Sequence, residues 1–299
     1  MNQTVSLSAP AKVNLFLRVL RRRSDGFHEL ETLFQAIDYC DDVLIELNDL
    51  GQISLEVTGL EVGPVKENLA YRAASAYREA AGLQEGIHVS LAKHIPAGAG
   101  LGGGSSDAAA VLRGLDYLTE GLLDSESLSK IASNIGSDVP FFLSDSTTAI
   151  ARGRGEILEP IQALPGHTLL LVLPPVHVST RDAYEMLGRS SDDYEHHTSP
   201  GLFRARGGWD TVISSAHNDF EVTIADLYPE VRCSLGALRQ KGYPLVLLSG
   251  SGGACFAITR NGGDVESDAH ELTEELGWPC LVTRTLESYQ LITPMSAKP

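Results

Sequence analysis

The chain has 299 residues, 43% apolar and 21% charged, which is enough for one large globular domain or two medium ones. Its 39 acidic residues outnumber the 23 basic ones, and the formal net charge of −16 argues against a general nucleic-acid binder, which needs a basic face. This charge does not exclude an anionic small molecule as substrate, because backbone dipoles bind phosphate even in an acidic protein.

Neither a membrane segment nor a disulfide framework is expected. No apolar run approaches the roughly 18 residues that cross a bilayer, and residues 1–12 lack the basic start and apolar stretch of a signal peptide. The four cysteines form no CxxC pair, which indicates reduced thiols and argues against a zinc site. We therefore expect a cytoplasmic protein.

Strands and helices alternate in the first half of the chain. Three segments show the period-two alternation that predicts β-strands: 13–20, 43–47 and 53–57. A helix is expected over 69–81, because its apolar residues share one face, Asn68 can cap its start and Gly82 can end it. Residues 87–95 predict another strand, and helical spacing of apolar residues predicts a helix from about Ser105.

The pattern changes near residue 163, and a second set of elements follows. Strands are expected at 167–175, 244–250, 254–259 and 278–286, and helices at 229–242 and 268–277. The polar, turn-rich segment 188–210 predicts a long loop, and 294–299 predicts a frayed tail. We therefore expect an α+β protein of two domains, residues 1–163 and residues 164–299.

The segment PAGAGLGGGSSDAAAVL, residues 96–112, concentrates glycine directly before a predicted helix. Five glycines lie between positions 98 and 104, where they would be costly in a regular helix or strand. A strand, a glycine-rich turn and a helix N-terminus make an anion site, because the first helical N–H groups are unpaired. Ser105 and Ser106 can cap the helix, touch phosphate oxygens or hold magnesium, and Asp107 suits the helix dipole and could reach a metal.

Other glycine motifs fit this segment less well. Gly98, Gly100 and Gly103 satisfy the dinucleotide pattern GxGxxG, but they follow several strands that do not resemble the start of a βαβ unit. No lysine follows the glycines as in the P-loop pattern, and the chain has no HRD or DFG of protein kinases. A plain flexible turn would not need five glycines, two serines and a clean helix.

In these motifs the chain resembles the GHMP kinases, the superfamily of galactokinase, homoserine kinase, mevalonate kinase and phosphomevalonate kinase. PAGAGLGGGSSDAAA is similar to their second motif, and its GLGGGSS form is typical of the 4-diphosphocytidyl-2-C-methyl-D-erythritol kinase family. APAKVNLFLRVLRRRSDGFHELETLFQAID resembles that family's N-terminal signature, and NLAYRAA, IGSDVPFFL, HNDFE and SGSGGACFA resemble its later blocks in the same order. The resemblance covers most of the chain and is weakest over 185–215. It implies an N-terminal half like ribosomal protein S5 domain 2 and a ferredoxin-like C-terminal half, with ATP and substrate between them.

The resemblance implies that the glycine loop wraps the phosphates of ATP. The residues expected at ATP are Asn68, Lys93, Pro96, Gly98, Gly100, Leu101, Gly102, Gly103, Gly104, Ser105 and Ser106. Asn68 and Lys93 would lie near the nucleoside, with a plain N-cap and a solvated strand charge as the respective alternatives. Mg²⁺ would accompany the nucleotide, with Ser105 or Ser106 as its ligand.

The same resemblance assigns the catalytic residues. Lys12 and Asn14 share one face of the first predicted strand, because side chains two apart point the same way. Lys12 would be an active-site lysine rather than surface decoration, and Asn14 would bind substrate. Asp138, in GSDVP, matches the aspartate that takes the proton of the substrate hydroxyl, with a turn aspartate as the alternative. Lys12 would keep this carboxylate ionised and offset charge on the attacking oxygen.

The turn DGFH, residues 25–28, resembles the place where this family holds the cytosine of its substrate. Phe27 would stack on the base, where the family usually has tyrosine, and His28 would hydrogen-bond the base edge. Tyr184 would form a second aromatic wall, and Thr180 would touch the substrate. A structural histidine and a core tyrosine are the alternatives for His28 and Tyr184.

A second glycine-rich turn, SGSGGACFA at 249–257, resembles the family's third motif, which lies near the ATP and substrate phosphates. It adds candidate contacts, with a tight hairpin as the alternative: Ser249, Gly250, Ser251, Gly252 and Gly253. HNDFE, residues 217–221, is expected to be structural, and the arginines at 21–23 are expected to be solvated charges.

The resemblance implies transfer of the ATP γ-phosphoryl group to the 2-hydroxyl of 4-diphosphocytidyl-2-C-methyl-D-erythritol, a step of the non-mevalonate isoprenoid pathway. The residues alone imply only a phosphate-binding enzyme. A homoserine or mevalonate kinase is the nearest alternative, although DGFH with Tyr184 argues against substrates that carry no base. A dinucleotide-binding oxidoreductase and a catalytically inactive ligand sensor are further alternatives. We expect ATP and Mg²⁺ as cofactors, a small-molecule substrate, no nucleic-acid or membrane partner, and a monomer or weak homodimer.

Overall fold

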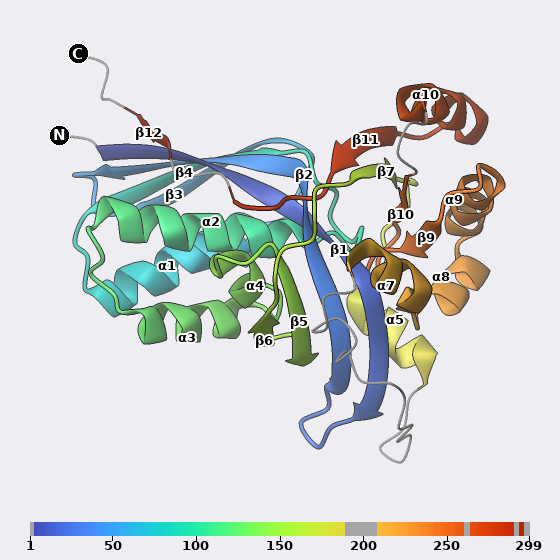
Figure 1. Ribbon diagram of the computed structural model, residues 1–299. Coiled ribbons are helices and arrows are strands. Elements are labelled where there is room, and N and C mark those ends of the chain that lie inside the picture. The colour runs from blue at the N-terminus through green and yellow to red at the C-terminus, as the bar shows by residue number, and fades with distance from the viewer. Residues whose placement is uncertain (1–2, 189–207, 260–263, 290–292, 296–299) are drawn as a thin grey trace.

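The computed structural model describes residues 3–188, 208–259, 264–289 and 293–295. Its framework is two β-sheets, one of eight strands and one of four (Figure 1). Helices α1 to α4 lie together on one side of the larger sheet, and α9 and α10 lie beside the smaller one. The α+β class expected from the sequence is confirmed, while the domain boundary at residue 163 stays a prediction.

The larger sheet is built around a long hairpin. Its strands are β1 (Gln3–Arg22), β2 (His28–Asn48), β3 (Ile53–Gly59), β4 (Gly86–Lys93), β5 (Thr148–Gly153), β6 (Ile157–Pro160), β8 (His217–Asn218) and β12 (Thr293–Met295). The order is β12-β1-β2-β4-β3, with β5 beside β2, β6 beside β5 and β8 beside β1. β1 and β2 are antiparallel from Gln3↔Leu47 to Arg22↔His28, so the DGFH turn lies at the tip of the hairpin.

β1 is much longer than the predicted strand 13–20, and residues 9–17 are buried on both faces. One face of the sheet is covered by η1 (Val65–Glu67), α1 (Leu69–Ala81), α2 (Gly103–Leu118), α3 (Ser125–Ile135) and α4 (Val139–Leu143). Small residues let α2 approach the sheet closely: a Cβ at Gly114 would lie 2.3 Å from Ile45 Cδ1. The predicted strand 13–20 lies in the C-terminal half of β1, so period-two alternation did not capture residues 3–12.

The smaller sheet packs against the other face of the hairpin. It has the antiparallel order β11-β7-β10-β9, from β7 (Thr168–Val172), β9 (Leu245–Leu248), β10 (Cys255–Ile258) and β11 (Cys280–Arg284). Leu169, Leu171 and Phe256 point toward Val13 and Leu33 of the hairpin in one apolar cluster. Its second face is covered by helices, and this half holds α5 (Thr180–Leu187), α7 (Gly208–Ser215), α8 (Glu221–Leu227), α9 (Pro229–Gln240) and α10 (Val265–Leu276).

Strand pairing also crosses between the two halves of the chain. β8 pairs in parallel with β1 through Phe16↔His217 and Leu17↔Asn218, and β12 pairs antiparallel with β1. The prediction of a frayed tail was therefore wrong for residues 294 and 295, while 296–299 lie outside the described residues. The hairpin thus carries contacts from both halves, which places its polar residues at their junction.

Three further predictions need correction. The glycine-loop helix begins at Gly103, two residues before the predicted start. The predicted loop 188–210 ends in a helix, since α7 begins at Gly208; residues 189–207 lie outside the described part of the chain. A βαβ unit does precede the glycine loop, because β3 and β4 are parallel and α1 connects them.

In the parts of the chain that the structure describes, every helix is too short or too polar to span a bilayer.

Candidate active site

A cleft of about 1660 Å³ lies where the glycine loop, the tip of the β1–β2 hairpin and α5 meet. The sequence-predicted residues that line it are Lys12, Asn14, Phe27, His28, Asn68, Lys93, Pro96, Gly98, Gly100, Leu101, Gly102, Gly103, Gly104, Ser105, Asp138, Thr180, Tyr184, Gly250 and Ser251. Four predicted contacts are not among the lining residues: Ser106, Ser249, Gly252 and Gly253. Residues that are up to 239 positions apart in sequence, from Lys12 to Ser251, therefore face one cavity.

The glycine loop folds into a turn that ends as the N-terminus of α2. Gly98, Gly100 and Gly102 have φ of +72°, +79° and +72°, a region that side chains with a Cβ rarely adopt. Gly102 is the N-cap of α2 and offers no side chain to the first turn. The first N–H groups of α2 therefore come from residues of the glycine loop, and no capping side chain occupies them. They are available for an anion, as at other helix N-termini that bind phosphate.

The second glycine turn braces this loop from behind. Ser249 Oγ donates to the Gly100 carbonyl at 3.0 Å, and the Ala254 N–H donates to the Ala99 carbonyl at 3.0 Å. A Cβ at Gly252 would lie 2.0 Å from Gly100 N, and one at Gly100 would lie 1.9 Å from Ser249 O. Ser249 and Gly252 therefore pack against the loop, whereas Gly250 and Ser251 line the cleft.

Lys12 is buried under the glycine loop, with 3% of its surface exposed. Its Nζ donates to Asn14 Oδ1 at 2.6 Å and to the Gly100 carbonyl at 2.8 Å, and its backbone N–H donates to Leu101 O at 2.9 Å. Burial lowers the pKa of its ammonium group, and the charge of Asp138 opposes that shift. This is a fixed internal cation rather than surface decoration.

Asp138 lies opposite Lys12, with Oδ2 3.9 Å from Nζ. It occupies the N-cap position of α4, yet its side chain makes no capping hydrogen bond. The side chain keeps 28% of its surface exposed and faces the cleft. The structure thus favours a carboxylate open to a ligand over a turn-capping aspartate.

Asn14 links Lys12 to the interior of the sheet. Its Nδ2 donates to Thr32 Oγ1 at 2.8 Å, and Thr32 Oγ1 donates to the Phe16 carbonyl at 2.6 Å. Both side chains are almost fully buried. This chain of hydrogen bonds fixes the Asn14 amide so that its oxygen faces the Lys12 ammonium. The sequence analysis missed Thr32, although it lies directly across the hairpin near the predicted pair.

The aromatic residues differ from the expected pair of walls. The rings of His28 and Tyr184 stack on each other, with centroids 5.1 Å apart and planes 22° apart. Phe27 is 52% exposed, and the guanidinium of Arg154 lies 4.7 Å above its ring. Tyr184 also meets Phe220 edge-on, and its burial raises the pKa of its phenol. The two predicted aromatic walls are therefore each packed on another side chain, and Arg154 joins the cleft as a residue that the sequence analysis did not single out.

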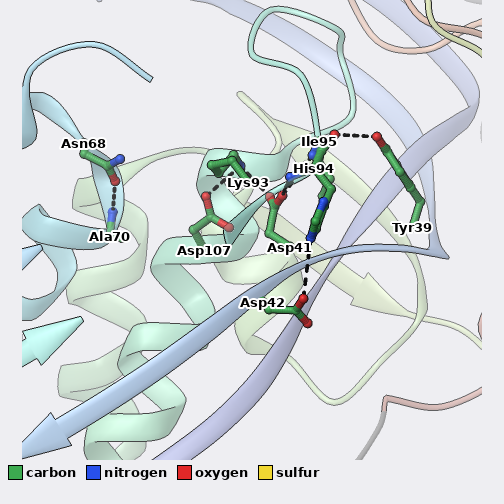
Figure 2. A network of polar contacts seen from close by, with 9 residues as sticks. All are labelled: Tyr39, Asp41, Asp42, Asn68, Ala70, Lys93, His94, Ile95 and Asp107. Atoms are coloured by element: carbon green, nitrogen blue, oxygen red, sulfur yellow. Dashed lines mark hydrogen bonds and ion pairs between the residues drawn. The ribbon is translucent and has the colours of Figure 1, made fainter. Parts of the chain in front are cut away.

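Lys93 is buried and paired, which corrects the alternative of a solvated charge. Its Nζ donates to Asp41 and, at 2.8 Å, to Asp107 Oδ2, so that strands β2 and β4 and helix α2 meet at one ammonium group (Figure 2). Burial raises the pKa of Asp107 to about 7; Lys93 opposes the shift and Asp41 adds to it. Asn68, also drawn in Figure 2, accepts a hydrogen bond from the Ala70 N–H at 2.9 Å and is thus the N-cap of α1.

The two serines of the loop face different spaces. Ser105 lines the cleft, and a Cβ at Gly136, just before the Asp138 turn, would lie 3.5 Å from its Oγ. Ser106 is buried, and its Oγ has no hydrogen-bond partner in the described residues. It lines a separate cavity of about 110 Å³ together with Tyr289. Of the two, only Ser105 is placed to reach a ligand in the cleft.

No ready-made metal cage is present in the described residues, where no three His, Cys, Asp or Glu side chains gather around one point. Mg²⁺ bound with a nucleotide usually keeps several waters and contacts few protein side chains besides the phosphates. Ser105 and Asp138, which both line the cleft, supply oxygen atoms of the kind that Mg²⁺ prefers.

Comparison with known proteins agrees with this geometry. Residues 68–146 match the GHMP kinases N terminal domain, and residues 204–277 match the GHMP kinases C terminal family. The chain is 37% identical to the 4-diphosphocytidyl-2-C-methyl-D-erythritol kinase of Geobacter metallireducens, across 95% of this chain and 99% of that protein. It is 38% identical to the enzyme of the same name from Pelobacter propionicus, across 95% of this chain and 100% of that protein.

Solved structures give the same result. A crystal structure of 4-(cytidine 5'-diphospho)-2C-methyl-D-erythritol kinase matches with a TM-score of 0.74 and 37% identity, over 94% of this chain and 98% of that chain. Homoserine kinase from Cytophaga hutchinsonii matches with a TM-score of 0.72 over 98% of both chains, but its 18% identity shows a shared fold alone. The chain therefore belongs to the 4-diphosphocytidyl-2-C-methyl-D-erythritol kinase family of the GHMP kinases.

Proposed function

We propose that the protein transfers the γ-phosphoryl group of ATP to the 2-hydroxyl of 4-diphosphocytidyl-2-C-methyl-D-erythritol. The observation that carries the proposal is the placement of Lys12 and Asp138, 3.9 Å apart, in one cleft with the glycine loop and the DGFH turn. Family membership supports this choice of substrate, which belongs to the non-mevalonate isoprenoid pathway. Homoserine and mevalonate carry no nucleobase that the aromatic side of the cleft could hold.

Asp138 is the proposed general base. Its carboxylate makes no capping hydrogen bond and would accept the proton of the substrate hydroxyl. As this proton leaves, the hydroxyl oxygen would attack the γ-phosphorus, the bond from the γ-phosphorus to the β-phosphate oxygen would break, and ADP would be released. Lys12 would stabilise negative charge on the attacking oxygen and the transferred phosphoryl group. Its hydrogen bonds to Asn14 and Gly100 hold the ammonium in place without a need for reorganisation during the reaction.

The nucleotide side of the site is the glycine loop. Its turns and the start of α2 would place backbone N–H groups against the ATP phosphates, and Asn68 and Lys93 line the same part of the cleft. Mg²⁺ would enter with the nucleotide, and we propose Ser105 rather than Ser106 as its protein ligand. The metal would neutralise charge on the β- and γ-phosphates.

The substrate side is the tip of the hairpin together with α5. Phe27, His28, Thr180 and Tyr184 line this part of the cleft. The stacked rings of His28 and Tyr184 present an aromatic surface, and Phe27 with Arg154 presents a second one. A cytosine could pack between such surfaces while ring nitrogens read its edge. We further propose a cytoplasmic enzyme that acts as a monomer or weak homodimer.

Release of ADP from Mg-ATP tests the proposal. The cytidylyl substrate should support turnover, whereas mevalonate and homoserine should not, and Asp138→Asn should abolish most of the activity. Turnover with mevalonate or homoserine instead would assign the chain a different acceptor. Absence of ADP release with all three would leave only nucleotide binding.

A further inference from the structure

The two ends of the glycine loop are held by one buried cluster of charged side chains from β2, β4 and α2. The ladder between β2 and β4 ends at Asp42↔Ala92, and β4 itself ends at Lys93, which still pairs with Gly59 of β3. Residues 94 and 95 leave the sheet just before the loop begins at Pro96. Their backbone groups would lack partners from β2 at this point, and buried N–H groups left unpaired are costly. Beyond the end of the backbone ladder, side chains of β2 supply the hydrogen-bond partners instead.

Asp41 makes most of these contacts. Its Oδ1 accepts the backbone N–H groups of His94 at 2.6 Å and Ile95 at 2.9 Å, and its Oδ2 accepts from Lys93 Nζ. The hydroxyl of Tyr39 donates to the His94 carbonyl on the same side (Figure 2). Asp41 itself is fully buried. One carboxylate thus holds three consecutive residues at the entrance to the loop.

The exit of the loop is tied to the same carboxylate through Lys93. Lys93 Nζ also donates to Asp107 Oδ2 at 2.8 Å, and Asp107 lies in the second turn of α2, directly after the loop. A Cβ at Gly103 would lie 3.2 Å from Lys93 Nζ, so the ammonium sits against the first residue of the helix. The seven residues from 96 to 102 are therefore clamped at both ends by one ion cluster.

A β-bulge in β2 lies close to Asp41. In the pairing with β1, Pro10 faces Cys40 while Ala11 faces Ile37, which leaves Asp38 and Tyr39 as extra residues in β2. Bulges of this kind re-aim the side chains that follow them. The bulge lies immediately before Asp41, in the stretch that contacts residues 93–95.

We propose that Asp41 is a positioning residue of the phosphate-binding loop, which it holds ready for the nucleotide through Lys93, Asp107 and the N–H groups of residues 94 and 95. Asp41 does not line the cleft, so it acts through the loop rather than on the ligand. A preformed loop loses less conformational freedom when it binds, and this raises affinity. Lys12 and Asp138 pair with each other and share no ion pair with Asp41, Lys93 or Asp107, so the chemistry at that pair should be little affected. The proposal deepens the proposed function, because it names what sets nucleotide affinity at that site.

Asp41→Asn tests the proposal with almost no change in volume. An asparagine has one acceptor oxygen and an NH₂ group, so it must either lose the two N–H bonds or direct a donor at the Lys93 ammonium. We expect the KM for ATP to rise about tenfold, since a lost charge-assisted hydrogen bond has roughly this effect. The kcat at saturating ATP and the KM for the cytidylyl substrate should stay within about twofold.

Asp42→Asn is the matched control. It makes the same substitution one residue further along β2, at a 66% exposed side chain whose partner is His94 Nε2 at 3.5 Å. Such a surface pair contributes little, so the KM for ATP should not change. Calorimetric titration with ADP gives nucleotide affinity without turnover, so it decides the role of Asp41 even where the cytidylyl substrate is not phosphorylated.

Two results would overturn the proposal. One is a folded Asp41→Asn protein that binds ADP as tightly as the wild type, and the other is a fall in kcat with an unchanged KM for ATP. Where Asp41→Asn does not fold, Asp107→Asn replaces it, because that variant releases only the exit of the loop. It should raise the KM for ATP about threefold at constant kcat, and an unchanged KM would equally refute the proposal.

Discussion

Two groups of lysine and aspartate lie at the glycine loop, and they differ in how exposed their carboxylates are. Lys93 lies between Asp41 and Asp107, with side-chain exposures of 4%, 0% and 2%. Lys12 is equally buried, but its partner Asp138 is 28% exposed and lies 3.9 Å away, beyond hydrogen-bond distance. The same two residue types thus form a sealed cluster, whose three side chains are at most 4% exposed, and an open pair, whose carboxylate is partly exposed.

This difference shows that the pairing of lysine with aspartate can serve two roles. Inside the sealed cluster the Lys93 ammonium bonds two buried carboxylates, so the cluster holds the backbone in place and breaking it is costly. In the open pair the lysine is held by Asn14 and Gly100 instead, which leaves the Asp138 carboxylate free to accept a proton. We expect substitutions in the sealed cluster to change nucleotide affinity and stability, and those in the open pair to change the rate.

Asp138→Asn should have the largest effect on turnover. It keeps the shape of the side chain but removes the proposed proton acceptor, so kcat should fall by about 10²–10⁴ while the KM for ATP stays close to wild type. Steady-state ADP release measures both constants. Asp145→Asn, at a 99% exposed side chain, is the control and should be as active as the wild type. A variant that keeps its kcat would remove the functional distinction between the two pairs.

Gly100→Ala should break the loop at which the two groups lie. Gly100 has φ of +79°, and its added Cβ would lie 1.9 Å from the Ser249 carbonyl oxygen. We expect a loss of about 3 kcal/mol in the free energy of unfolding together with weaker ATP binding, because both backbone strain and a clash with the bracing turn arise. Denaturant unfolding and ADP titration measure the two effects.

Gly277→Ala separates strain from clash. Gly277 has a similar φ of +81°, but nothing lies within 4 Å of the added Cβ. It should lose only about 1 kcal/mol of stability and bind ADP normally. Equal losses in the two variants would mean that contact with the second glycine turn contributes nothing.

Asp107 should make stability depend on pH. Its pKa is raised from 3.8 to about 7 in the folded protein, so the folded state binds more protons than the unfolded state between these values. The free energy of unfolding should therefore fall as pH rises through this range, by roughly 2 kcal/mol between pH 5 and 7 for this group alone. Asp107→Asn cannot ionise, so its unfolding free energy should decline less steeply over the same interval. Parallel pH profiles for the two proteins would show that the sealed cluster does not hold this proton.

Much of this arrangement could be predicted from the sequence, because glycine patterns, helix signals and family motifs are local. Lys12, Asp138 and the glycine loop were placed in the site, and α1 was bounded correctly by Asn68 and Gly82. Asp41 and Thr32 were missed, since each lies in a strand and its partner is distant in sequence, so no local pattern marks it. Ser249 and Gly252 were placed at the substrate because a glycine-rich turn looks the same whether it contacts a ligand or another loop.

Thr32→Val should have the smallest effect and would refine the account of the open pair. Valine keeps the volume of threonine but removes the acceptor of Asn14 Nδ2 and the donor to Phe16 O. Because Asn14 and Thr32 are almost fully buried, the Asn14 amide loses a partner that water cannot readily replace, and we expect a cost of about 1–2 kcal/mol in stability. A less firmly held Asn14 should let Lys12 move away from Asp138 and lower kcat a few-fold.

Thr148→Val makes the same change at another fully buried threonine, which hydrogen-bonds Gln35 Oε1 at 2.8 Å away from the cleft. Stability should fall by a similar amount, while kcat should not change. If both variants lose the same activity, the Asn14–Thr32 hydrogen bonds support only the fold. If only Thr32→Val slows turnover, the open pair depends on the buried Asn14–Thr32 hydrogen bond, just as the sealed cluster depends on Asp41. The two groups would then be held equally firmly, and they would differ only in that the open pair leaves a carboxylate exposed to the cleft.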